Sequence, residues 1–170
     1  MSSILRAVSI LMGRENKHPR AWLVSRHAPS PGLTVVFVIT STADRAMLHD
    51  LARRNHWNAV FSSTTEEACN AVNRTRPQVI LIDRDVDSAG WRNAVSSLAM
   101  ASDGACVVLI SSVIDEYLWN EVVTNGGYDV LHKPLNEDDV LRNLRLAWSY
   151  WSGTRKPVTR KKKLFGLDRF

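Results

Sequence analysis

Residues 78–87 constrain the fold of this chain more than any other stretch. Four apolar residues, Val79 to Ile82, follow one another with no polar residue between them. Such a run is typical of a central parallel strand buried on both faces, because a half-exposed strand alternates polar and apolar residues. The run ends abruptly at Asp83, where open α/β sheets place their ligands. A lone Asp in this position is also a common loop cap, so the rest of the chain must decide between the two interpretations.

Apolar runs of the same kind recur along the chain and alternate with segments of helical periodicity. We predict strands at 35–39, 58–61, 79–82, 106–110 and 130–132. The predicted helices cover 43–55, 64 to about 74 after the capping box, 90–100, 113–125 and 136–151. The motif Ser63-Thr64-Thr65-Glu66 has the form of a capping box, and Gly126-Gly127 is a helix stop signal. Strands that alternate with helices predict an α/β fold, a doubly wound five-stranded parallel sheet.

The composition is that of an ordinary globular protein, with 45% hydrophobic and 23% charged residues in a chain of 170. No apolar run approaches the roughly 20 residues that cross a bilayer, and the first residues lack a signal-peptide cleavage pattern. We therefore expect a cytoplasmic protein. Cys69 and Cys106 are expected to be free thiols, because neither has the spacing of a metal or redox motif.

Charge divides the chain into three parts. Residues 34–151 carry 10 Lys and Arg against 15 Asp and Glu, whereas both ends are basic. We expect an N-terminal extension at 1–32 with a short amphipathic helix and a linker, a domain at 33–151, and a basic tail at 152–170. The tail is either a solvated run or a contact for a polyanion or an anionic membrane.

Three predicted strands end in residues that carry chemistry. Asp83 follows the third strand, Ser111-Ser112 the fourth, and Lys133-Pro134 the fifth. Because the carboxyl ends of parallel strands meet at one edge of a sheet, a carboxylate, a hydroxyl and an ammonium are expected around one crevice.

With these motifs in this order, residues 33–151 resemble the receiver domain of two-component response regulators, the flavodoxin-like fold of chemotaxis regulators. The resemblance implies that Asp83 is the phosphoacceptor and that Lys133 pairs with the phosphoryl oxygens. It also implies that Ser111 hydrogen-bonds the phosphoryl group and that Ser112 leaves room for it. The Lys133–Pro134 bond, cis in the family, would orient the loop, and the backbone carbonyl of Asp85 would bind Mg²⁺.

The chain departs from the family at the end of the first strand. The family usually places two acidic Mg²⁺ ligands there, but this sequence has Thr40 and Ser41. Mg²⁺ is normally bound through one or two carboxylates, so weak or absent Mg²⁺ binding is expected, with Asp83 as the main anion. Asp44 and the Asp85 side chain are candidates for partial substitutes. Val130 stands where the family carries an aromatic switch residue.

Single residues keep simpler interpretations. Lys133 is equally well explained as the ion-pair partner of Asp83, and Ser111 as a satisfied loop hydroxyl. His132 is interpreted as a core or edge residue. Trp119, Trp148 and Trp151 are either core residues or an apolar interaction face near the last two helices.

The leading hypothesis is a stand-alone receiver-like signalling module, not an enzyme, that works through protein contacts. Its partners would be a protein or a second copy of the chain at the face near the last two helices, and a sensor kinase. The 19 residues after Trp151 are too few for a DNA-binding domain. A conventional phosphoacceptor regulator is the alternative. A flavodoxin-like small-molecule binder or enzyme is less favoured, because no glycine-rich loop follows the first strand.

Overall fold

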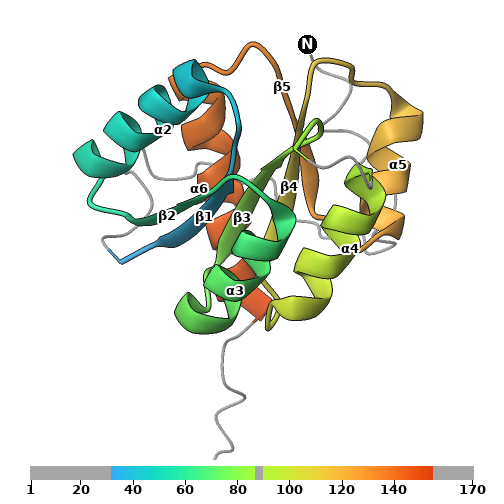
Figure 1. Cartoon of the computed structure of the whole chain (residues 1–170), viewed down its shortest axis with the longest axis horizontal. Coiled ribbons are helices and arrows are strands. Elements are labelled where there is room, and N and C mark those ends of the chain that lie inside the picture. Colours follow the sequence, from blue (N-terminus) through green and yellow to red (C-terminus); the bar gives the residue numbers. More distant parts are fainter. Residues whose placement is uncertain (1–31, 87–89, 155–170) are drawn as a thin grey trace, which may run out of the picture.

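The computed structural model describes residues 32–86 and 90–154. The predicted N-terminal helix and most of its linker, in residues 1–31, lie outside the described residues, as does the basic tail from residue 155 onward. Within the described ranges, strands and helices alternate along the chain (Figure 1). The strands are β1 Thr34–Val38, β2 Asn58–Ser62, β3 Val79–Asp83, β4 Cys106–Ser111 and β5 Asp129–His132. The helices are α2 Thr42–Arg54, α3 Thr65–Thr75, α4 Trp91–Ala101, α5 Glu116–Thr124 and α6 Glu137–Thr154.

The strands form one five-stranded parallel sheet in the order β2-β1-β3-β4-β5. The predicted fold class, a doubly wound α/β sheet, is therefore confirmed. The strand order reverses between β1 and β3, which is the point where sheets of this order bind ligands. The loops after β4 and β5 lie together at the top of Figure 1. Asp83, Ser111 and His132 stand at this carboxyl edge, with Asp83 opposite Ile110 and Ser111 opposite His132.

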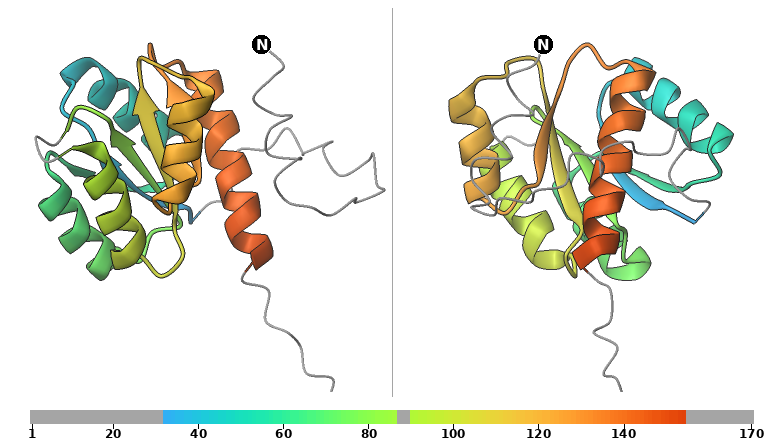
Figure 2. Two further views of the ribbon diagram at one scale, coloured as in Figure 1. Left: turned by 90° about the vertical axis from the view of Figure 1, so that its right-hand side faces the viewer. Right: turned by 180° about the vertical axis from the view of Figure 1, so that it is seen from behind.

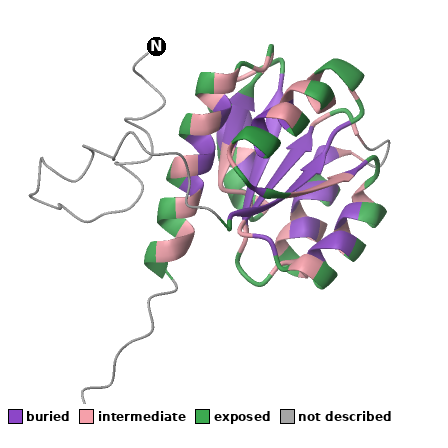
Figure 3. Ribbon diagram, turned by 90° about the vertical axis from the view of Figure 1, so that its left-hand side faces the viewer, coloured by how far each residue is buried: buried purple, intermediate pink, exposed green. Residues whose placement is uncertain are grey.

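Two helical layers explain why the central strands are apolar at every position. Helices α2 and α6 cover one face of the sheet and α3, α4 and α5 cover the other (Figure 2). Successive side chains of a strand point to opposite faces. Leu81 therefore packs under α2 and α6, whereas Ile80 and Ile82 pack under the other three helices. Figure 3 shows the buried strands at the centre and the exposed outer surfaces of the helices.

Two helices start later than predicted, because a side chain further along the chain caps each of them. Helix α3 is capped by Thr64, whose hydroxyl accepts a hydrogen bond from Glu67 N at 3.2 Å, so the predicted Ser63–Glu66 box is shifted by one residue. Helix α5 begins at Glu116 and not at 113, because Asp115 accepts a hydrogen bond from Leu118 N at 2.6 Å. A side chain that caps a helix fixes its first turn.

Helix α6 continues to Thr154, so the first residues of the expected tail are helical. None of the helices in the described ranges is both long and apolar enough to traverse a bilayer.

Gly127 lies where β5 approaches α5, and a methyl group does not fit there. A Cβ on Gly127 would meet Val122 Cγ1 at 2.5 Å and Val122 O at 2.9 Å. Because the backbone oxygen cannot rotate away, we expect Gly127→Ala to lower the free energy of unfolding by about 1–3 kcal/mol. Urea denaturation measures this loss. The matched control is Gly153→Ala in α6, where nothing lies within 4 Å and the change should be neutral or slightly stabilising. Equal stability of the two variants would contradict the packing argument.

Candidate functional site

Asp83 is the last residue of β3 and one of the few charged residues in the interior, with 3% of its surface exposed. Because successive side chains of a strand point to opposite faces, Asp83 lies on the same face as Leu81, the face covered by α2 and α6. Its Oδ1 accepts a hydrogen bond from Asp85 N at 3.3 Å. A carboxylate held in this way needs a positive partner, because an unpaired buried charge is costly.

Lys133 supplies that partner from the other side of the site. It follows β5, and its backbone N–H donates to Ser111 O at 2.9 Å. Its Nζ forms an ion pair and hydrogen bond with Asp83 Oδ2. Burial alone lowers the pKa of the Lys133 ammonium, but the hydrogen bond and charge of Asp83, then of Asp44, outweigh it, so its pKa is raised. The predicted pairing of Lys133 with Asp83 is therefore present in the folded chain.

Asp44 contributes a second carboxylate that the sequence pattern did not single out as a partner of Lys133. It lies in the first turn of α2, and its Oδ2 is 3.4 Å from Lys133 Nζ. Ser41 caps this helix, accepting a hydrogen bond from Asp44 N at 3.3 Å. One ammonium thus contacts two carboxylates from two different elements. An acid in the first turn of a helix after the first strand is the only signal that pointed to this residue.

Ser111 is buried, and its own loop uses its hydroxyl. Its Oγ donates to Val113 O at 2.7 Å and accepts from Val113 N at 3.1 Å. Arg84 Nη1 also lies 3.5 Å from the same oxygen. Ser112 is exposed beside it. Nothing in the sequence distinguished Arg84 from an ordinary loop residue.

The remaining predicted site residues lie around the same edge. The Lys133–Pro134 peptide bond is cis. His132 is exposed at the end of β5, whereas Val130 is buried under the α3, α4 and α5 layer. Asp85 is exposed, next to Asp83 in the loop after β3.

The residues at this edge do not fit a Mg²⁺ ion. Thr40 is exposed and offers no charge, and the Ser41 hydroxyl serves as the helix cap. The two nearest carboxylates, Asp83 and Asp44, are both in contact with the Lys133 ammonium. In the described part of the chain, no group of three or more His, Cys, Asp or Glu side chains is placed to hold a metal ion. Both carboxylates therefore already contact a cation of the chain itself, although its single positive charge offsets only one of their two negative charges.

The three tryptophans predicted as an interaction face do not lie together. Trp119 is buried in the layer of α3, α4 and α5, and its Nε1 donates to Asp129 at 3.3 Å. Trp148 and Trp151 lie on α6 and pack on the other face of the sheet. Their rings stack with centroids 5.6 Å apart. Any apolar surface that they form excludes Trp119.

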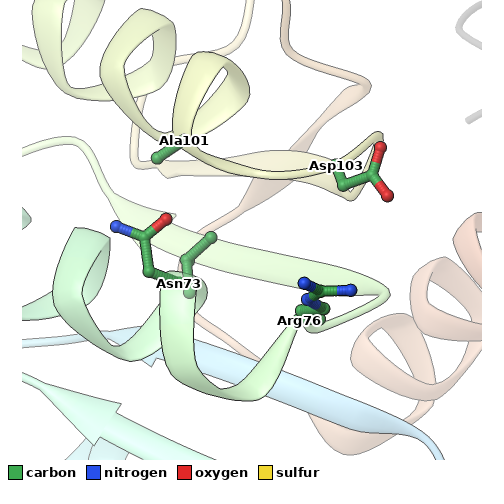
Figure 4. Close-up of a pocket in the computed structure, with 5 residues that line it drawn as sticks. Asn73, Arg76, Ala101 and Asp103 are labelled. Carbon is green, nitrogen blue, oxygen red and sulfur yellow. The ribbon is translucent and has the colours of Figure 1, made fainter.

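Two pockets on the described part of the surface lie away from the site. The pocket in Figure 4 is lined by residues near the ends of α3 and α4, among them Asn73, Arg76, Ala101 and Asp103. Arg76 and Asp103 precede β3 and β4, so this pocket is at the amino edge of the sheet, opposite Asp83. A second pocket follows the outer face of α3 and is lined by Glu67, Asn70, Asn73 and Arg74. Neither contains a predicted site residue.

Comparison with known proteins finds similarity in structure alone. No protein-family model matches the sequence, and no curated protein matches it. A chemotaxis protein of the CheY type from Vibrio cholerae superposes with a TM-score of 0.63 at 18% identity, over 68% of this chain and 98% of that one.

Two other matches come from different signalling contexts. One is the receiver domain of a sensor histidine kinase from Pseudomonas aeruginosa, with a magnesium ion in its active-site cleft. It superposes with a TM-score of 0.60 at 15% identity, over 69% of this chain and 98% of that one. The other is a co-crystal structure of a histidine phosphotransfer protein with the receiver domain of a Saccharomyces cerevisiae response regulator. The matching chain superposes with a TM-score of 0.61 at 15% identity, over 76% of this chain and 95% of that one. The chain therefore has the fold of CheY-like response regulator receiver domains.

Proposed function

We propose that this protein is a stand-alone, receiver-like signalling module of a two-component or phosphorelay system that acts by binding other proteins. In this proposal Asp83 takes up a phosphoryl group slowly or not at all, and Mg²⁺ binds weakly. The module is not an enzyme beyond any transfer of a phosphoryl group to its own Asp83. Similarity to receiver folds supports the class of function, and the chemistry of the site supports the loss of metal dependence.

One observation carries the proposal: the positive charge beside Asp83 comes from Lys133, while Thr40 and Ser41 add no negative charge for a metal. Transfer of a phosphoryl group to a carboxylate brings two anions together and requires positive charge in place beforehand. A divalent ion normally supplies much of that charge and is held by at least one or two carboxylates. Here the carboxylates are already paired, so the ion would have to displace an ammonium.

The alternative, a conventional phosphoacceptor regulator, is favoured by the retained pairing of Asp83 and Lys133 and by the cis Lys133–Pro134 bond. Both features are expected in a receiver domain that accepts a phosphoryl group. The two functions differ in what a phosphoryl mimic does to the unmodified protein.

Partner contacts are assigned to the surface of α6. Tyr150 and Leu146 are exposed large residues on this helix, and the stacked Trp148 and Trp151 are only partly buried. A protein partner, a second copy, or a kinase or phosphotransfer protein would dock here. The proposal keeps the division into an extension at 1–32, a receiver-like domain at 33–151 and a tail at 152–170 that contacts polyanions or anionic lipid. It places the chain in the cytoplasm, and Cys69 and Cys106 are free thiols.

The test is a Mg²⁺ titration of ¹⁵N-labelled protein, with and without beryllofluoride, followed by amide chemical shifts. We expect small, non-saturating shifts up to millimolar Mg²⁺ and no beryllofluoride-dependent resonances from the loops after β3 and β4. Acetyl phosphate should label Asp83 slowly or not at all, as read by intact-protein mass.

Thr40→Asp with Ser41→Asp is the matched gain-of-function variant, and Thr40→Asn with Ser41→Asn is its neutral control. The acidic pair should raise Mg²⁺ affinity and lower stability without metal, because it crowds like charges around Asp83. Saturable Mg²⁺ binding and full beryllofluoride capture by the unmodified chain would refute the metal-poor function and support the conventional one.

A further inference from the structure

Lys133 lies between two carboxylates in a partly closed part of the sheet edge. The exposed side-chain fractions are 3% for Asp83, 22% for Asp44 and 24% for Lys133. All three are therefore mostly shielded from water, in which their charges would be screened. The two shielded carboxylates share this one cation. Removing the ammonium would therefore leave two negative charges close together with no positive charge between them.

The backbone at each side of this unit is fixed by hydrogen bonds of its own. Asp83 ends a central strand, and its Oδ1 is held by Asp85 N. Asp44 is set by the Ser41 cap of α2. Lys133 N–H is tied to Ser111 O. The meeting of the three side chains thus follows from the ends of β3 and β5 and the start of α2.

Two further cations of the described residues near this edge, Arg84 and Arg45, have different partners. Arg84 Nη1 contacts Ser111 Oγ, and Arg45 Nη1 contacts Ile39 O at 3.4 Å and Ser63 Oγ at 3.5 Å. The guanidinium of Arg45 also lies over the Phe61 ring, 5.2 Å from its centroid. Among the contacts described for Asp83 and Asp44, the ammonium of Lys133 is therefore the cation that both carboxylates share.

We propose that Asp83 and Asp44 form a two-carboxylate cation site whose resident cation is the ammonium of Lys133, and that this ammonium excludes divalent metal. Two carboxylates completed by water are a donor set that Mg²⁺ and Mn²⁺ accept, once the ammonium is gone. The inference deepens the proposed function, because it names the group that takes the place of the metal. It also assigns Asp44 a part in the weak binding of divalent metal, beside the hydroxyls of Thr40 and Ser41 after β1.

The experiment compares Mn²⁺ binding by the full chain and by Lys133→Met, using isothermal titration calorimetry and thermal unfolding. Lys133→Met should bind Mn²⁺ about 10–100-fold more tightly than the unmodified chain, the range seen when a group touching a metal's ligands is changed. Its melting temperature should rise with added Mn²⁺, because a ligand that binds only the folded state stabilises it. The melting temperature of the unmodified chain should not respond.

Three controls isolate the residues. Lys133→Arg keeps a cation and should stay metal-insensitive. Lys133→Met with Asp44→Asn should lose the gained Mn²⁺ affinity, whereas Asp44→Asn alone should gain none. If Lys133→Met does not fold without metal, Lys133→Gln provides the same loss of charge with a polar side chain, and recovery of folded protein by Mn²⁺ is the readout.

Failure of this inference is distinct from failure of the proposed function. A metal-insensitive Lys133→Met and Lys133→Gln would overturn the inference while the metal-poor signalling function stands. A gain that persists when Asp44 is Asn would also overturn it, because the second carboxylate would then be another group. Rapid labelling of Asp83 by acetyl phosphate without divalent metal, together with an Asp44-dependent gain in Lys133→Met, would instead refute the proposed function and leave the two-carboxylate site in place. Saturable Mg²⁺ binding and beryllofluoride capture by the unmodified chain would overturn both, because the ammonium would then not exclude the metal.

Discussion

Lys133→Met should lower the free energy of unfolding by about 2–3 kcal/mol at neutral pH. Removing one partner of a buried ion pair typically costs about 3–5 kcal/mol, because the other charge stays buried without compensation. Asp83 is buried, while Lys133 keeps about a quarter of its side chain exposed, so the loss should lie at or below the lower end of that range. Urea denaturation followed by circular dichroism gives the value.

A double-mutant cycle with Asp83→Asn separates the pair from its surroundings. Asp83→Asn should be nearly neutral, because it removes the buried charge and leaves Lys133 near Asp44 and water. The double variant should regain most of the stability that Lys133→Met loses. The control is Arg53→Met, which breaks an ion pair to Asp50 at 2.8 Å whose side chains are well exposed, and should cost less than about 1 kcal/mol. A small effect of Lys133→Met, equal to that of Arg53→Met, would show that Asp83 is solvated in solution.

Asp129→Ala, at the start of β5, should lower the free energy of unfolding by about as much as Lys133→Met does. The Asp129 carboxylate accepts hydrogen bonds from Trp119 Nε1, from Val130 N at 2.8 Å and from Asn143 Nδ2 at 2.8 Å, and so joins α5 to α6. An alanine leaves these donors without their acceptor, and each unsatisfied buried group costs about 1–3 kcal/mol. We expect a total loss of roughly 3 kcal/mol after relaxation, together with a change in tryptophan emission from Trp119.

Asp129→Asn is the matched control, because it keeps the shape and one acceptor oxygen, and it should lose less. It also gives a pH test. Burial raises the pKa of the Asp129 carboxyl above its ordinary value of 3.8. The folded state therefore holds this proton more tightly than the unfolded state, so the stabilisation from protonation is present at low pH and is lost as pH rises through the raised pKa. Relative to Asp129→Asn, the unmodified chain should be more stable at about pH 4 than at pH 7. A difference that is independent of pH would contradict the burial of a titrating carboxyl.

Much of the fold follows from the sequence because the physics that sets it is local. Runs such as Val79 to Ile82 have no polar alternation, and only a sheet covered on both faces buries every residue of such a strand. The meeting of Asp83 with Lys133, 50 residues apart, was also predictable, because parallel strands bring their carboxyl ends to one edge.

Other features depend on packing between elements and were not predictable in the same way. Helical periodicity shows that Trp119 and Trp148 belong to amphipathic helices, but it does not show which sheet face each helix covers. The two residues lie on opposite faces. The contact of Asp44 with Lys133 depends on the rotation of α2 about its own axis, which is set by the core residues Leu48, Leu51 and Ala52.

The hydroxyl of Ser111 has a consequence for how an event at the sheet edge would be transmitted. Both of its short hydrogen bonds go to the backbone of Val113, in the loop that leads to α5. Val113 and Tyr117 are exposed large side chains on this loop and on the first turn of α5. If an anion at Asp83 took the hydrogen bond that this hydroxyl donates, the Val113 carbonyl would lose its donor, and the loop would need another partner for that oxygen. A single oxygen atom at the end of β4 thus holds the backbone of Val113, whose own side chain is exposed at the outer surface.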